Sequence, residues 1–141
     1  MPDKPTLSDP ALRRFLQEPG RLGVLATINL SGTPHQCVVW YRLTDDGILL
    51  NSAEGRRWPA NLRRDGRTSL MVVDPDRYVV VRGRAEVVAE GDQAQADIVA
   101  LAHLYHRDDP ATIEKLVRDF WSHQRRVSFL LRPWSVGTHE E

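Results

Sequence analysis

The residues best suited to chemistry in this chain are arginines gathered in one short segment. Five of them lie between Arg56 and Arg67, although the 19 basic and 19 acidic residues of the whole chain cancel. The segment follows the apolar run 48–50 and the small polar residues Asn51 and Ser52, so the arginines begin where a strand leaves the core. Backbone N–H groups at a helix start and guanidinium groups can converge on a phosphate at such a place. The segment therefore predicts a local anion site.

Composition limits what this anion site serves. With 141 residues and 41% hydrophobic content, the chain has the size of one ordinary domain, and we expect a single domain over 1–141. The neutral balance argues against a surface that binds nucleic acid, which is normally basic. The single cysteine, Cys37, cannot form an internal disulfide and indicates a reducing cytoplasm. No apolar run typical of a signal peptide or a membrane span is present, so we expect no membrane association.

Periodicity predicts the elements that position the arginines. A first helix begins near Ser8 or Asp9 and ends at Pro19-Gly20, and two amphipathic helices precede the last strand. Six strands are expected, over 23–28, 36–43, 48–52, 68–73, 78–89 with an interruption at Arg82-Gly83, and 126–132, after which Pro133-Trp134 turns out of the sheet. Short turns between them favour an antiparallel arrangement.

The predicted fold class is mainly β (α+β), with six antiparallel strands in a small closed or nearly closed barrel and with peripheral helices. Side chains fill the interior of a barrel this small. A ligand of more than a few atoms must then lie outside the barrel or against a second subunit, which indicates a site at a dimer interface.

Other candidate sites in the sequence are weaker. His103 and His106 have His-x-x-His spacing, but no third ligand is fixed, and we expect no metal site. No serine has the strand–turn–helix context of a nucleophile. The spacing of Trp121 on its helix indicates a core residue, and the neighbours of Cys37 indicate a strand residue.

Several segments, in this order along the chain, resemble those of a known family. They are Gly23-Val24-Leu25-Ala26-Thr27, Gly32-Thr33-Pro34-His35, Val39-Trp40-Tyr41, Asn51-Ser52-Ala53-Glu54-Gly55-Arg56-Arg57, Asn61-Leu62-Arg63-Arg64-Asp65-Gly66-Arg67 and Val80-Val81-Arg82-Gly83-Arg84-Ala85. As an ensemble the chain resembles the split β-barrel flavin and deazaflavin oxidoreductases related to pyridoxamine 5'-phosphate oxidase. The branch that uses the deazaflavin coenzyme F420 is the most similar, with FMN as the alternative cofactor. The resemblance implies a six-stranded split barrel that forms a homodimer, with cofactor sites between the subunits.

The resemblance also implies which residues bind the cofactor. The phosphate is expected near Arg56, Arg57 and Asn61, beside Asn51 and Ser52 at the strand end. The tricyclic ring is expected along the middle strand, and one aromatic residue is expected from the other subunit; these residues are Gln36, Val38, Val39, Trp40 and Trp134. Relatives often place a lysine where this chain has Trp58-Pro59, so the geometry of phosphate binding is expected to differ here.

An F420-dependent reductase that transfers a hydride to a small organic acceptor is the expected function. In hydride transfer the cofactor carries the chemistry, so the missing acid–base pair is no obstacle. The catalytic residues stay unassigned, with Tyr41 and Tyr78 as candidate proton donors. Arg63, Arg64 and Arg67 are expected on the exposed face of a short helix, outside the site. A carrier that binds flavin or F420 without turnover is the alternative function from another class.

Overall fold

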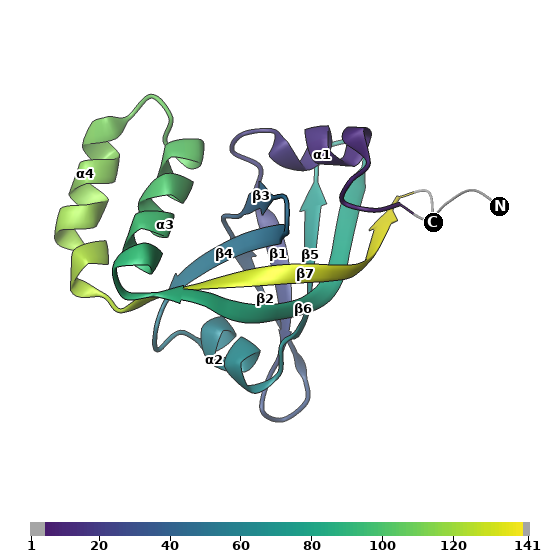
Figure 1. Ribbon diagram of the computed structural model, residues 1–141, viewed down its shortest axis with the longest axis horizontal. Coiled ribbons are helices and arrows are strands. Elements are labelled where there is room, and N and C mark those ends of the chain that lie inside the picture. Colours follow the sequence, from purple (N-terminus) through teal and green to yellow (C-terminus); the bar gives the residue numbers. More distant parts are fainter. Residues whose placement is uncertain (1–4, 140–141) are drawn as a thin grey trace.

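The computed structural model describes residues 5–139 and arranges them around one antiparallel sheet (Figure 1). The elements in chain order are α1 (Pro10–Gln17), β1 (Gly23–Ile28), β2 (Pro34–Val39), β3 (Arg42–Thr44), β4 (Gly47–Ala53), α2 (Arg57–Arg64), β5 (Arg67–Val73), β6 (Tyr78–Glu90), α3 (Gly91–Tyr105), α4 (Pro110–Asp119), the short 3-10 helix η1 (Trp121–His123) and β7 (Arg126–Thr138). The predicted class, mainly β with peripheral helices, is confirmed.

The sheet has seven strands in the described part of the chain, in the order β2-β1-β5-β6-β7-β4-β3. The prediction of six strands was wrong because it treated 36–43 as one strand. The chain breaks the ladder at Trp40-Tyr41, and the backbone N–H of Tyr41 donates to the hydroxyl of Tyr105 at 3.0 Å instead of to a neighbouring strand. A side chain from a distant helix thus decides where β2 ends.

The two outermost strands of this order, β2 and β3, are consecutive in the chain. Because only Trp40 and Tyr41 separate Val39 from Arg42, the two ends of the sheet lie at most about 11 Å apart at this point. No ladder joins β2 to β3 within residues 5–139, so the hydrogen-bonded barrel is not closed. Of the closed and nearly closed forms that the sequence left open, the closed form was wrong. We call the gap at Trp40-Tyr41 the seam.

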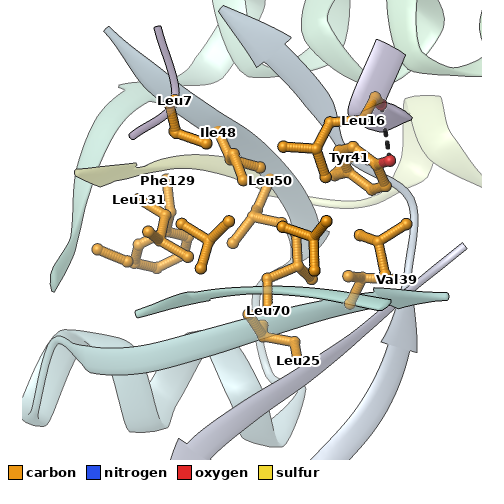
Figure 2. Close-up of a cluster of buried hydrophobic side chains, with 14 of the residues drawn as sticks. Leu7, Leu16, Leu25, Val39, Tyr41, Ile48, Leu50, Leu70, Phe129 and Leu131 are labelled. Carbon is orange, nitrogen blue, oxygen red and sulfur yellow. Dashed lines mark hydrogen bonds between the residues drawn. The ribbon is translucent and has the colours of Figure 1, made fainter. Parts of the chain in front are cut away.

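Apolar side chains from most strands fill the inside of the curled sheet (Figure 2). Leu25, Leu50, Leu70 and Phe129 are all fully buried there. Helix α1 covers one end of this core with its apolar face, and the hydroxyl of Tyr41 donates to the backbone carbonyl of Leu16 at 2.7 Å. This bond ties the seam to the first helix.

Strands β6 and β7 form the longest pairing and contain the predicted irregularity. Their register shifts between Arg82 and Gly83, where a Cβ atom would collide with the carbonyl oxygen of Arg132. The predicted interruption is thus a bulge or similar irregularity of the pairing, and β6 continues through it. The predicted end of the last strand at residue 132 was wrong, because β7 passes Pro133 and continues pairing with β6 to Thr138.

Helices α3 and α4 lie side by side outside the sheet, next to the ends of β6 and β7 to which they are joined (Figure 1). A second apolar cluster, separate from the barrel core, holds them together; its buried members are Ile98, Leu101, Ala102, Ile113 and Trp121. Trp40 from the seam packs against this cluster, which attaches the helices to the sheet. No described helix has the length and apolar character needed to cross a bilayer.

Candidate functional site

Six of the ten predicted cofactor-binding residues lie around a cleft beside the seam. The cleft has a volume of about 230 Å³ and lies between the ends of β2 and β4, the start of α2, and the segment from α3 to β7. Six residues predicted to bind cofactor line it, namely Val38, Val39, Trp40, Asn51, Ser52 and Arg56. The other lining residues are Trp58, Ile98, Trp121 and Arg126. Two strands that are not hydrogen-bonded to each other thus supply its opposite walls.

Trp40 forms a rigid part of the wall. Its ring stacks on Tyr105, with the centroids 4.8 Å apart and the planes 6° apart, and it meets Trp121 edge-on at 6.3 Å. Because Tyr105 covers one face of the indole, a planar ligand can meet only the opposite face or an edge.

Arg126 is the site residue that the sequence analysis missed. Its side chain is only 5% exposed although it carries a charge. Nε donates to Asn51 Oδ1 at 3.0 Å, one terminal nitrogen donates to Gln124 Oε1 at 2.6 Å, and the guanidinium lies 5.9 Å over the ring of Trp121. No carboxylate of the described chain forms an ion pair with it. Buried charges are normally paired, so the bare guanidinium is a marker of an anion site.

The electrostatics of Arg126 follow from this burial. Desolvation, together with the like charge of Arg56, lowers the pKa of the Arg126 guanidinium to about 10. At neutral pH the group therefore still carries its charge. An anion bound between Arg56 and Arg126 would relieve the repulsion between them and replace the lost solvation.

Two further features at this end of the cleft fit an anionic group. The hydroxyl oxygen of Ser52 is buried and has no hydrogen-bond partner within residues 5–139. Helix α2 begins directly after Arg56, and no side chain caps its first turn. Unpaired donors, an open helix start and two guanidinium groups form a donor set suited to a phosphate.

Arg57 and Asn61, predicted beside the phosphate, lie elsewhere. They line a shallow hollow against the turn between β1 and β2. The Asn61 amide nitrogen donates to Thr27 Oγ1 at 3.0 Å and to Asn29 Oδ1 at 3.1 Å, so this side chain supports the turn. The structure therefore separates the two neighbouring arginines, placing Arg56 in the cleft and Arg57 on the other side of the helix start.

The remaining predicted contacts also lie outside the cleft of this chain. Gln36 is exposed on β2, paired with Ala26, and Trp134 is 60% exposed on β7. Tyr41 and Tyr78, the candidate proton donors, do not line the cleft either. Burial raises the pKa of Tyr41, whose hydroxyl is engaged by Leu16. The geometry gives Tyr41 a structural role.

The other arginines of the segment have partners of their own. Arg63 binds Glu54 and Glu90, and Arg64 donates to the carbonyl of Ile28 and to Asn61 Oδ1. Both are exposed on α2, as expected. Arg67 begins β5 and pairs with Asp65, so its assignment to the helix was wrong.

Trp58, at the position where the resemblance led us to expect different phosphate binding, is 7% exposed and packs against Phe129 with ring centroids 5.8 Å apart. This position therefore contributes an aromatic wall rather than a charge, and Arg126 supplies the second cation of the cleft from another strand.

A larger open hollow of about 910 Å³ adjoins the cleft, and Arg126 lines both. Its rim carries acidic and basic side chains in nearly equal number, including Glu90, Asp92 and Arg125. Within the described residues, histidine, cysteine and carboxylate side chains form no cluster of three or more that could hold a metal.

The curled sheet with its lateral cleft is the architecture of the split-barrel proteins. Residues 8–124 match the family model described as pyridoxamine 5'-phosphate oxidase, and the chain belongs to that family. The resemblance seen in the sequence is confirmed at this level.

Solved structures agree with this assignment. An F420 reductase is similar at 26% identity and a TM-score of 0.67, over 86% of this chain and 93% of that one. A conserved hypothetical protein of Mycobacterium tuberculosis, Rv2991, has 24% identity and a TM-score of 0.73 over 97% and 89%. The heme storage protein HutZ of Vibrio cholerae has 19% identity and a TM-score of 0.67 over 92% of each chain. The last two likenesses show the fold alone.

Proposed function

We propose that this protein is an F420-dependent reductase that binds the cofactor phosphate between Arg56 and Arg126. The observation that carries the proposal is the buried, unpaired guanidinium of Arg126 at the cleft that gathers six predicted cofactor residues. The likeness to an F420 reductase supports the choice of cofactor.

Different residues of the cleft would bind different parts of the cofactor. Arg56, Arg126 and the hydroxyl of Ser52 would hold the phosphate, while Val38, Val39 and the free side of Trp40 would bound the ring. When bound, a deazaflavin would supply the hydride, and the apolar side chains of the cleft would limit the access of water to it.

The size of the cleft favours a site shared between two subunits. Its 230 Å³ is less than the roughly 300–1,000 Å³ that small-molecule sites usually provide. The cleft would then hold only part of the cofactor, and the adjoining hollow and a second subunit would cover the remainder.

A row of apolar side chains on the outer face of the sheet fits such a second subunit. Val38, Val24, Met71 and Val80 are cross-strand neighbours over four adjacent strands. Val38 is 64% exposed and also lines the cleft, so the row leads directly into the site. We propose that the protein is a homodimer joined through this row, with one cleft at each edge of the interface.

Replacing Met71 by arginine tests the homodimer. A charge in the middle of the row would be buried without a partner on association, so we expect the dissociation constant of the dimer to rise about a hundredfold. Light scattering after size exclusion, over a range of concentrations, measures it. Ala111→Arg adds the same charge on exposed α4 and should leave the dimer intact. A wild-type monomer, or a dimer unaffected by Met71→Arg, would contradict the assignment.

Fluorescence titration tests the cofactor. We expect saturable quenching of F420 fluorescence at micromolar protein concentration, and turnover of reduced F420 with at least one electron-poor acceptor. Tight binding of FMN with none of F420 would favour the FMN-dependent alternative. Binding without turnover across a panel of acceptors would favour a carrier. Failure to bind either cofactor would refute the proposed function.

A further inference from the structure

The buried arginine of the cleft is linked to a buried carboxylate on α3 that it does not touch. Asp97 is 8% exposed and forms no ion pair with a described residue. Between the two charges lie Asn51 on β4 and Ser128 on β7, both on adjacent paired strands. Two opposite charges are thus buried close to each other and joined only through neutral groups.

The hydrogen bonds between them run in one direction. Arg126 Nε donates to Asn51 Oδ1 at 3.0 Å, and Asn51 Nδ2 donates to Ser128 Oγ at 2.9 Å. Ser128 Oγ then donates to Asp97 Oδ2 at 2.7 Å. Each bond polarises the next when all point the same way. We call this chain of three bonds the relay.

The direction of the hydrogen bonds in the relay is set by the groups that can only donate or only accept. Arg126 can only donate, so the Asn51 oxygen must face it. The Asn51 nitrogen also donates to the carbonyl of Ala94 at 2.9 Å, and a carbonyl can only accept. Turning the amide over would place donor against donor and acceptor against acceptor. The hydroxyl of Ser128, which receives a bond from Asn51, is therefore left to donate to an acceptor, and Asp97 supplies it.

We propose that Asp97 is a positioning residue for the anion site. Through Ser128 and Asn51, its carboxylate orients the guanidinium of Arg126 and acts as the remote counter-charge to it. Because the carboxylate does not contact the guanidinium, one edge of Arg126 stays available to a ligand. A direct ion pair would occupy that edge and weaken the attraction for an incoming phosphate. The inference rests on the proposed binding of an anionic group in this cleft.

A consequence is that α3 is part of the site although it contributes only Ile98 to the wall. Ala94 and Asp97, one turn apart on α3, accept hydrogen bonds from Asn51 and Ser128, the two neutral members of the relay. Displacement of α3 would break the hydrogen bonds of Ala94 and Asp97 with the relay together. The relay would then no longer orient the guanidinium of Arg126.

Ser128→Ala tests the relay with a small change in volume. We expect F420 affinity to fall about fivefold or more, the size of a coupled hydrogen-bond network. Asp97→Asn keeps the shape and an acceptor oxygen but removes the charge, and should weaken binding in the same direction. Gln93→Ala removes the other partner of Asp97, at 2.9 Å, without breaking the relay, and should leave affinity within about twofold.

A double-mutant cycle separates orientation of Arg126 from general damage. The Arg126→Lys variant keeps the positive charge but lacks the Nε–H group that donates to Asn51. In this background, Ser128→Ala should cause little further loss of F420 affinity. An equal loss in both backgrounds, with folded spectra, would overturn the proposal. So would wild-type affinity in both Ser128→Ala and Asp97→Asn.

A readout without cofactor distinguishes failure of this inference from failure of the proposed function. The ¹⁵N–¹H signal of Arg126 Nε should move in Ser128→Ala and Asp97→Asn but not in Gln93→Ala. Inorganic phosphate should perturb the same signal in the wild type. If F420 does not bind but these shifts occur, the relay and anion site stand and the cofactor assignment fails. An unmoved Nε signal in both relay variants would refute the relay itself.

Discussion

Arg126→Ala is expected to weaken F420 binding by about tenfold to a hundredfold, the largest single effect on the cofactor. A hydrogen bond to a charged group contributes about 1.5–3 kcal/mol, and this guanidinium has no carboxylate of the described chain to satisfy it. Fluorescence titration of the folded variant measures the change. Removal of the charge should also reduce the salt dependence of binding.

Arg125→Ala is the matched control for this variant. Arg125 is the preceding residue, carries the same charge and is exposed on the larger hollow instead of the cleft. Its removal should change affinity by less than about threefold, because exposed charges contribute little. Equal losses from the two variants would mean that general positive charge, not the buried guanidinium, attracts the cofactor.

Phe129→Ala is expected to have the largest effect on stability, lowering the free energy of unfolding by about 3–5 kcal/mol. Phe129 is fully buried in the barrel core (Figure 2). Its ring packs against that of Trp58. Its truncation leaves a cavity that neighbouring strands, held by their ladders, cannot fill. Urea unfolding followed by circular dichroism measures the loss.

Phe120→Ala makes the same change at an exposed site. Phe120 is 54% exposed at the end of α4, so its truncation should alter stability by less than about 0.5 kcal/mol. Similar losses from both phenylalanines would contradict the placement of the core.

The sequence predicted the strands well where the signal is local. Alternation and turn residues placed β1, β4 and β5 to within two residues, and glycine marked the bulge at Gly83. The break at Trp40-Tyr41 has no local signal, because the hydroxyl of Tyr105 that stabilises it comes from a helix far along the chain. The continuation of β7 past Pro133 is equally non-local, since pairing with β6 outweighs the usual effect of proline.

The candidate site likewise contains one arginine with a local sequence signal and one without. Arg56 stood out in the sequence because it belongs to a visible basic segment. The sequence predicts Arg126 only as the first residue of the last strand. In the structure it pairs with Ala53, close to the arginine segment. That register was the available signal: the start of the last strand lies opposite the end of the strand that precedes the arginines.

The position of β7 between β6 and β4 has a consequence for synthesis of the chain. Before β7 docks, nothing bridges β4 and β6, Arg126 is absent from the cleft wall, and Ser128 is absent from its contact with Asn51. The anion site thus depends on contacts between residues very distant in sequence, which form late in folding. A chain that lacks β7 would lack Arg126 and Ser128, so under the proposed function we expect it to bind the cofactor poorly.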